Sequence, residues 1–96
     1  MAKTKQFIYP AEFTEYKAGK EQGFYIRFPD LEADGGGIFT YGLSLPHGIR
    51  MAREALSLHL ECLLKDNIGI PVASDIRRFK NTKTKFVTYI SCRIKI

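Results

Sequence analysis

Apolar and polar residues alternate along three stretches in the first half of the chain, which is the period of a β-strand. The first strand is predicted over residues 6–16, the second over 24–28 and the third over 38–41. The polar segment 17–23 contains glycine and predicts a hairpin turn between the first two strands. Because Pro10 cannot donate a hydrogen bond to a ladder, we expect the first strand to lie at a sheet edge or to carry a bulge.

The second half of the chain predicts one long helix and one long strand. The helix runs from Ser44 to about Asn67, where a glycine and a proline follow. Ser44 is the expected N-cap, although His47 stands where a glutamate would complete a capping box. Residues 86–96 alternate again as a final strand. The fold class is therefore α+β, in the order β-β-β-α-β: a three-stranded antiparallel sheet, one long helix packed on it, and a C-terminal strand.

The predicted helix has more apolar surface than one sheet needs. One stripe consists of Ile49, Ala52, Leu56, Leu60, Leu63 and Leu64. A second arc beside it consists of Met51, Ala55, Leu58 and Cys62. This second arc needs cover from elsewhere, either from residues 68–80 folding back onto the helix or from a second copy of the chain. These four residues are therefore candidates for self-association into a homodimer or a higher oligomer, and both alternatives stay open.

Length and composition fit a single folded domain over residues 1–96. The chain has 96 residues, of which 45% are hydrophobic and 26% charged, which is ordinary for a folded protein of one core. No apolar run has the length of a membrane span or of a signal peptide, so we expect a cytoplasmic protein. Cys62 and Cys92 lie far apart in sequence and are expected to be small buried residues, in neither a disulfide nor a metal site.

The net charge of +5 is unevenly placed along the chain. Residues 67–96 contain seven Lys or Arg and only Asp75 as an acid, whereas residues 1–66 contain eight basic and nine acidic side chains. The basic side chains Arg77, Arg78, Lys80, Lys83 and Lys85 surround one aromatic residue, Phe79. This composition suits contact with nucleic-acid phosphates and bases, or forms a solvated connection.

Candidate chemistry in the chain favours binding over catalysis. Neither histidine has a second ligand at metal-binding spacing, and no cysteine or serine lies in a nucleophile motif, so we expect no enzyme, no metal and no cofactor. The carboxylates Glu12, Glu15, Asp30, Glu32 and Asp34 belong to the first strand or to the loop after the second. They form either a solvated acidic rim or an acidic docking surface for a basic protein.

Several fragments in this order resemble a known family. They are Tyr9-Pro-Ala11, Phe28-Pro-Asp-Leu31, Phe39-Thr-Tyr-Gly42, Arg53-Glu-Ala-Leu56 and Ile70-Pro71. Together they are similar to the N-terminal domain of HicB antitoxins, over about residues 6–76. The resemblance implies a partial ribonuclease-H-like fold and the role of an antitoxin in a type II toxin–antitoxin system. Such an antitoxin binds a HicA-type toxin, a small mRNA-cleaving ribonuclease, and covers its active surface.

The resemblance also directs attention to one set of residues. An RNA-cutting toxin presents a basic surface, so an inhibitor gains association rate and specificity from acidic groups. The expected partner-binding residues are the five carboxylates together with Tyr9, Tyr25 and Leu31 as apolar anchors. Many HicB proteins carry a C-terminal DNA-binding domain, but this chain ends soon after its last strand, so we do not expect it to bind operator DNA. A nucleic-acid-binding regulator that uses residues 77–85 is the alternative.

Overall fold

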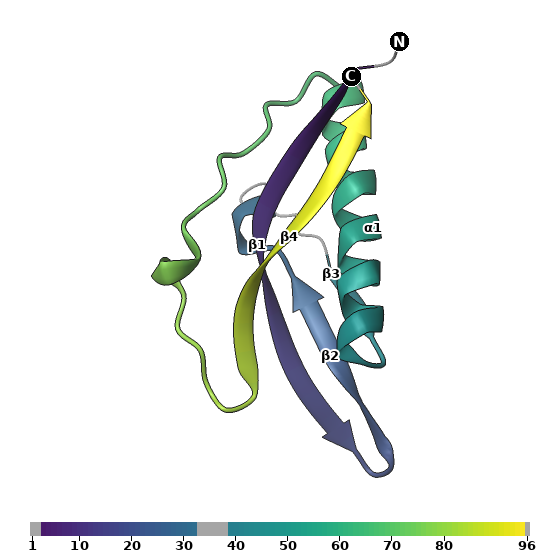
Figure 1. The fold of residues 1–96 in the computed structure, drawn as a ribbon, viewed down its shortest axis with the longest axis vertical. Coiled ribbons are helices and arrows are strands. Elements are labelled where there is room, and N and C mark those ends of the chain that lie inside the picture. Colours follow the sequence, from purple (N-terminus) through teal and green to yellow (C-terminus); the bar gives the residue numbers. More distant parts are fainter. Residues whose placement is uncertain (1–2, 33–38, 96) are drawn as a thin grey trace.

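The computed structural model describes residues 3–32 and 39–95, in which a four-stranded antiparallel sheet carries one long helix (Figure 1). The strands are β1 (Thr4–Ala18), β2 (Glu21–Arg27), β3 (Phe39–Gly42) and β4 (Lys85–Lys95), and the helix α1 is Leu45–Lys65. Two short 3-10 turns, η1 (Pro29–Leu31) and η2 (Ile76–Arg78), lie in the connections. The α+β class and the predicted order of strands and helix are confirmed.

The sheet has the strand order β3-β2-β1-β4, so the C-terminal strand is its fourth member. β4 pairs with β1 over eleven residues, from Thr4↔Lys95 to Thr14↔Lys85. The prediction of three strands and a C-terminal strand of open placement is compatible with this sheet, and the structure adds that the last strand pairs with β1. Periodicity identifies a strand but contains no information on its neighbour, which depends on contacts between distant parts of the chain.

β1 lies between two strands, so the expectation that Pro10 places it at the sheet edge is wrong for the strand as a whole. β2 pairs with β1 only from Glu12 to Ala18, and the β1–β4 register runs without a bulge. The Val87 N–H points away from β1, toward Asn81 Oδ1. By the alternation of an antiparallel ladder, the backbone N–H position of residue 10 then faces away from β4, where none of the described strands pairs with β1. The missing N–H of Pro10 therefore falls at a position without a strand partner.

The turn between β1 and β2 is tighter than the predicted segment 17–23. Only Gly19 and Lys20 separate the two strands, and Gly19 has a φ of 64°, a left-handed conformation that favours glycine. Gly23 belongs to β2, opposite Tyr16. The predicted start of the third strand, Ile38, lies outside the described residues.

The predicted N-cap of the helix is confirmed. The Ser44 hydroxyl accepts a hydrogen bond from the His47 N–H at 3.3 Å. The Leu43 N–H in turn donates to His47 Nδ1 at 2.9 Å. His47 therefore supplies the second half of a reciprocal cap, where the sequence indicated an incomplete box. The helix ends at Lys65, two residues before the predicted end, and Asn67 follows with a φ of 56°.

One face of the sheet packs against α1 and forms the core. Ala52, Leu56, Leu60 and Leu63 of the predicted apolar stripe are buried, together with alternate residues of β4: Ile90, Cys92 and Ile94. Phe13 stacks on Phe86 with ring centroids 5.1 Å apart. Gly42 and Gly48 let β3 and the helix approach closely, since an added Cβ at Gly42 would lie 2.6 Å from Gly48 N. The helix therefore covers one face of the sheet only.

Residues 66–84 run along the side of the sheet opposite the helix (Figure 1). At the edge of β1 that β2 leaves unpaired, the Tyr9 hydroxyl reaches out from the core and donates to the carbonyl of Pro71 at 2.5 Å. On the face away from the helix, the Ile76 N–H donates to the Tyr89 hydroxyl at 3.0 Å. The alternative in which residues 68–80 cover the second arc of the helix is therefore wrong. Within that arc Leu58 and Cys62 are exposed, whereas Met51 and Ala55 are half-buried. The expectation of a buried Cys62 is also wrong, while Cys92 is buried as predicted.

Candidate functional site

The sheet face turned away from the helix carries a group of aromatic side chains. Alternation along a strand places the helix-facing residues Phe13, Ile26 and Phe24 on one side. Their neighbours in sequence therefore project from the other side. Four of these are aromatic and come from three adjacent strands: Tyr16 of β1, Tyr25 of β2, and Phe39 and Tyr41 of β3. We call these four residues the aromatic patch.

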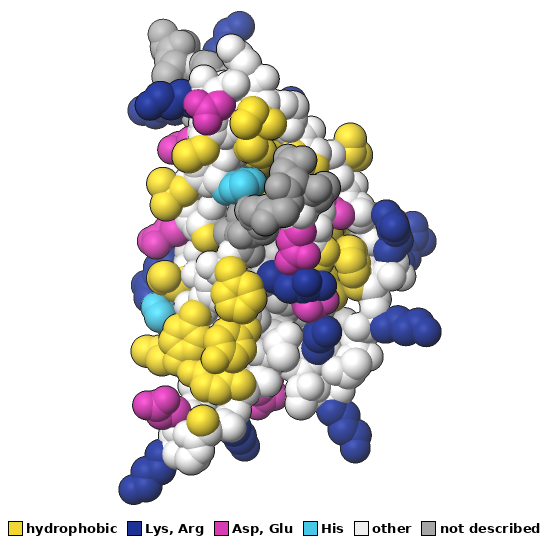
Figure 2. Space-filling view, turned by 180° about the vertical axis from the view of Figure 1, so that it is seen from behind, with side chains coloured by type: hydrophobic (Ala, Val, Ile, Leu, Met, Phe, Trp, Pro, Cys, Tyr) yellow, Lys and Arg dark blue, Asp and Glu magenta, His cyan; other side chains and the backbone are white. Residues whose placement is uncertain are grey.

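The rings of the aromatic patch pack against one another while much of their surface stays open. The Tyr25 ring centroid lies 4.8 Å from that of Tyr16, 6.0 Å from that of Tyr41 and 5.8 Å from that of Phe39. Tyr25 is 45% exposed and Phe39 is 67% exposed. A pocket of 190 Å³ opens beside these two rings and Thr14. Figure 2 shows hydrophobic side chains gathered on this side of the molecule, next to a group of charged side chains.

A hydrogen bond between two hydroxyls fixes part of the patch. The Tyr16 hydroxyl donates to the Tyr41 hydroxyl, and this bond is the main reason why the pKa of Tyr16 is raised to about 12. Since the two residues belong to β1 and β3, the bond spans the β2 strand between them. The patch is therefore held in one arrangement by polar as well as ring contacts, which lowers the ordering cost of binding.

The raised pKa predicts a change in the alkaline titration. The pKa of Tyr16 in the folded protein lies above the ordinary tyrosine value of 10.0. The protonated hydroxyl and its bond to Tyr41 therefore stabilise the folded state fully below pH 10, and this contribution is lost as the pH rises through about 12. We expect Tyr16→Phe to remove one high-pH step from the tyrosinate absorbance titration. Tyr25→Phe is the matched control and should retain that step. Identical titration curves for the wild type and Tyr16→Phe would contradict this assignment.

An ion cluster borders the aromatic patch. Arg27 Nε donates to Glu12 Oε1 at 2.9 Å, and Arg27 Nη1 lies 3.1 Å from Glu32 Oε2. Lys85 Nζ lies 3.5 Å from Glu12 Oε1. The hydrogen bond to Glu12 is the largest cause that raises the pKa of Arg27. Glu12 is only 8% exposed, so this carboxylate holds two cations in place at the edge of the patch and presents little charge to a partner.

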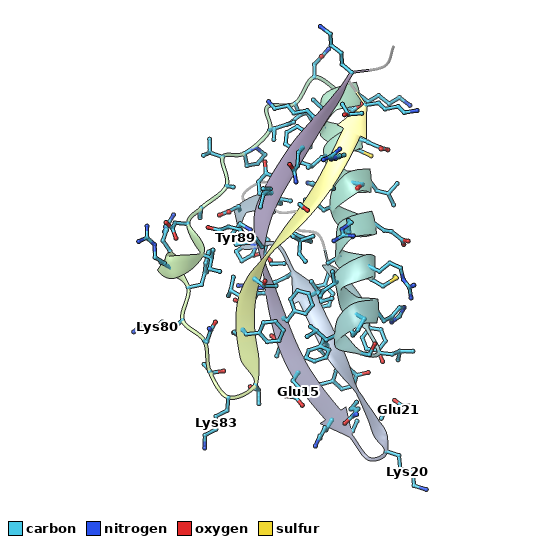
Figure 3. All side chains as sticks on the ribbon, viewed as in Figure 1. Glu15, Lys20, Glu21, Lys80, Lys83 and Tyr89 are labelled. Carbon is cyan, nitrogen blue, oxygen red and sulfur yellow. The ribbon has the colours of Figure 1, made fainter. Side chains whose placement is uncertain are left out.

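The structure does not assemble the expected acidic docking surface from the described carboxylates. Glu12 and Glu32 are paired with Arg27, as above. Asp30 accepts hydrogen bonds from the Ser74 N–H at 2.7 Å and from the Ser74 hydroxyl at 2.6 Å, which ties the 66–84 connection to η1. Glu15 is exposed (Figure 3). Asp34 lies outside the described residues. Arg27 therefore neutralises part of the charge of Glu12 and Glu32, whereas Ser74 fixes the position of Asp30 without cancelling its charge. The role of these carboxylates in docking stays a prediction.

Two of the three expected apolar anchors belong to the core. Tyr9 is 2% exposed and Leu31 is 4% exposed, so neither can enter a partner's pocket. Burial also raises the pKa of Tyr9. Tyr25 is the expected anchor that the structure places on the surface. Sequence reasoning missed Tyr16, Phe39 and Tyr41, although strand alternation from Phe13 and Thr40 contained the signal for their common face.

The basic segment does not form a single converging surface. Arg77 Nη2 lies 2.7 Å from Asp75 Oδ2, and this pairing lowers the pKa of Asp75 to about 2. Arg78 donates to the Ser74 hydroxyl at 3.1 Å, and Lys85 contacts Glu12. Figure 3 shows Lys80 and Lys83 pointing outward from the connection before β4. Two of the five predicted nucleic-acid contacts are therefore neutralised by carboxylates of the same chain.

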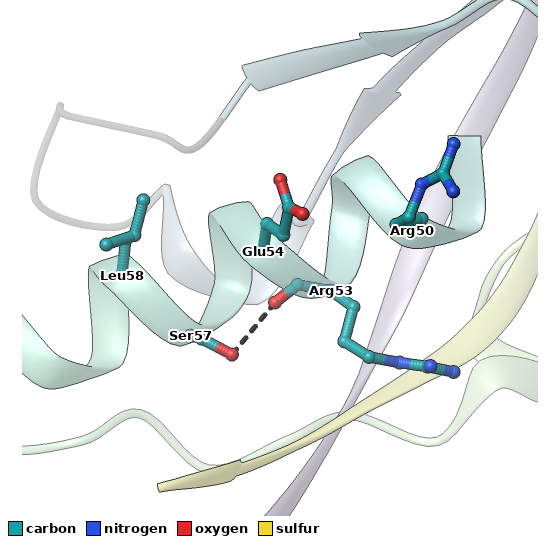
Figure 4. Close-up of a pocket in the computed structure, with 5 residues that line it drawn as sticks. All are labelled: Arg50, Arg53, Glu54, Ser57 and Leu58. Atoms are coloured by element: carbon teal, nitrogen blue, oxygen red, sulfur yellow. Dashed lines mark hydrogen bonds between the residues drawn. The ribbon is translucent and has the colours of Figure 1, made fainter. Parts of the chain in front are cut away.

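The outer surface of the helix carries a hollow lined by Arg50, Arg53, Glu54, Ser57 and Leu58 (Figure 4). Ser57 Oγ donates to the Arg53 carbonyl at 2.9 Å, a bond within the helix.

Across residues 3–32 and 39–95, no three His, Cys, Asp or Glu side chains come together as a metal-binding group. The helix described in this structure is not apolar enough over its length to cross a membrane. The aromatic patch is therefore the site that the geometry supports best.

The fold is shared with chains from two solved complexes. No protein-family model matches this chain, and no curated protein sequence matches it either. The chain is similar to one in a toxin–antitoxin complex from Streptococcus pneumoniae, with a TM-score of 0.77 and 22% identity over 92% of this chain and 69% of that chain. It is also similar to a chain in the HicA3 and HicB3 toxin–antitoxin complex, with a TM-score of 0.62 and 21% identity over 90% of this chain and 98% of that chain. At these identities the likeness establishes a common fold.

Proposed function

We propose that this chain is the antitoxin of a toxin–antitoxin pair and that it acts by binding its toxin. The observation that carries the proposal is the aromatic patch, which is exposed, pre-organised and placed on an open sheet face. Exposed aromatic groups of this kind supply most of the binding energy at protein interfaces. The shared fold supports the same reading, because both solved neighbours come from toxin–antitoxin complexes.

The proposed partner is a HicA-type, mRNA-cleaving toxin, and the chain is the HicB-like member of the pair with a partial ribonuclease-H-like fold. The sequence fragments around Tyr9, Phe28 and Arg53 support this assignment. In the proposed mechanism the aromatic patch fills an apolar part of the toxin surface. Arg27, held by Glu12 and Glu32, adds a charged group of fixed direction beside it. The chain masks the RNA-binding surface of the toxin and performs no catalysis itself.

Self-association is a second part of the proposal. Met51, Ala55, Leu58 and Cys62 follow one another along one side of α1 and are exposed or half-buried. Residues 66–84 leave this arc open, because Leu58 is 65% exposed and Cys62 is also exposed. A second copy of the chain fits the arc, which would place the two helices together and leave both aromatic patches free for toxin.

Co-expression with a HicA-type toxin tests the proposed function. We expect the chain to restore growth to cells that express the toxin, and the two purified proteins to form a complex at micromolar concentration or below. The purified complex should not cleave an mRNA that the free toxin cleaves. Catalytically inactive toxin serves as the control, since it should bind equally well without affecting growth. Cleavage of the mRNA by this chain alone, or no complex with any HicA-type toxin, would contradict the proposal.

A further inference from the structure

The outer edge of β4 presents backbone hydrogen-bonding groups along its C-terminal half. The Val87 N–H points away from β1, toward Asn81 Oδ1, and the Lys85 carbonyl accepts from the Thr82 N–H. In an antiparallel ladder, alternate residues share this outward direction. Tyr89, Ser91 and Arg93 therefore point their backbone N–H and C=O groups outward from the sheet.

The 79–84 connection occupies only the first part of this edge. Asn81 and Thr82 pair with Val87 and Lys85 at distances of 3.1 Å and 2.8 Å. No residue among 3–32 and 39–95 makes such a bond to the backbone of Tyr89, Ser91 or Arg93. The outer edge of β4 is therefore hydrogen-bonded to its own chain at Lys85 and Val87. Beyond Val87 the same edge continues as an unpaired strand. Such an edge is a template for strand addition.

Two arginines flank this unpaired stretch. Arg53 of α1 and Arg93 of β4 line a pocket of 440 Å³ together with Gln6, Ser91 and Cys92. Figure 4 shows the Arg53 side chain extending from the helix toward β4. Neither arginine makes an ion pair within the described part of the chain. Burial is the largest cause that raises the pKa of the Cys92 thiol, and the charge of Glu61 also raises it. Glu61 is the one acidic side chain among these causes, against the two arginines that line the pocket.

We propose that the β4 edge from Tyr89 to Arg93 binds an acidic, extended segment of another protein by strand addition, with Arg53 and Arg93 pairing its carboxylates. Main-chain hydrogen bonds would supply the register, and the arginines would select negative charge. A second copy of this chain fits less well, because antiparallel pairing of two β4 edges would bring two pairs of unpaired arginines together. The inference is independent of the toxin proposal, since no toxin enters its test.

A synthetic peptide that alternates valine and glutamate tests this edge. We expect saturable binding to the full chain by fluorescence anisotropy, weakened by added salt because the arginines are exposed to solvent. Two N-methylated versions of the peptide are the sharpest probes. Methyl groups on the alternate residues that face β4 remove the bonding N–H groups and should abolish binding. Methyl groups on the other residues should leave the affinity within about twofold, which is less than about 0.5 kcal/mol.

Substitutions in the chain give a second measurement. Ser91→Pro removes an outward N–H but no bond to β1, so the fold should survive while the peptide affinity falls about tenfold or more. Arg53→Glu with Arg93→Glu should weaken the acidic peptide and favour a lysine-containing one instead. Equal binding of the two N-methylated peptides would overturn the proposal. It would also be overturned if the peptide did not bind, in which case the arginines only protect the edge against aggregation, or if it induced dimers of the chain.

Discussion

Replacing Gly42 with alanine is expected to destabilise the protein by about 3 kcal/mol, which corresponds to a fall in Tm of roughly 12–24 °C. The added Cβ would overlap the Gly48 Cα atom and lie 2.6 Å from Gly48 N. Both are backbone atoms in the first turn of α1, so no side chain can rotate away. The helix would have to move off β3, and the contacts of Ala52 and Leu56 with the sheet would loosen. Chemical denaturation followed by circular dichroism measures the change.

Gly48→Ala is the matched control for this prediction. Its Cβ would lie 3.2 Å from Ile26 Cδ1 and 3.3 Å from Phe13 Cε2. These are the ends of side chains, which can shift by a few tenths of an ångström. Alanine also gains up to about 1 kcal/mol over glycine within a helix. We therefore expect Gly48→Ala to be close to neutral. Equal losses from both substitutions would mean that the approach of α1 to β3 is not limited by the Gly42 backbone.

The close approach of α1 to β3 also shows what the sequence could and could not predict. Hydrophobic periodicity predicted each strand and the helix, because those patterns depend on neighbouring residues alone. The third strand was predicted to end at residue 41, but the contact of Gly42 with Gly48 depends on the crossing of β3 and α1. The pairing of β4 with β1 likewise depends on contacts between distant parts of the chain. A local pattern also cannot distinguish a proline on an edge strand from Pro10, which lies in an inner strand at a position that only β4 flanks.

The candidate site was predicted only in part, for a related reason. Glu12 and Glu32 have the composition of an acidic docking surface, and only the register that places Arg27 opposite Glu12 shows that their charge is used internally. Tyr9 and Tyr25 are equally suitable anchors by residue type. Their opposite outcomes follow from strand parity: Tyr9 shares the helix-facing side of β1, whereas Tyr25 faces away from the helix on β2. The alternation along a strand shows which face each residue occupies only after one residue of that strand has been assigned to the core.

Loss of the Tyr25 ring is expected to weaken toxin binding more than any other single surface change in the aromatic patch. Tyr25 contacts all three other members of the patch and is half exposed. Truncation of a central aromatic anchor typically costs about 2 kcal/mol or more, or about a 30-fold rise in Kd. Phe39 is more exposed and lies at the edge of the sheet, so Phe39→Ala should cost less. Isothermal titration calorimetry with a catalytically inactive HicA-type toxin measures both changes.

Tyr89→Ala is the matched control, because Tyr89 is 46% exposed and also lies on the sheet face away from α1, but outside the aromatic patch. We expect Tyr89→Ala to change the toxin affinity by less than about threefold, or about 0.7 kcal/mol. The double variant Tyr25→Ala with Phe39→Ala should lose detectable binding while its circular dichroism spectrum and Tm stay close to those of the wild type, since both rings lie on the surface outside the core. Wild-type affinity in a folded double variant would place the toxin on another surface of the molecule. A loss with Tyr89→Ala as large as that with Tyr25→Ala would extend the docking surface to β4.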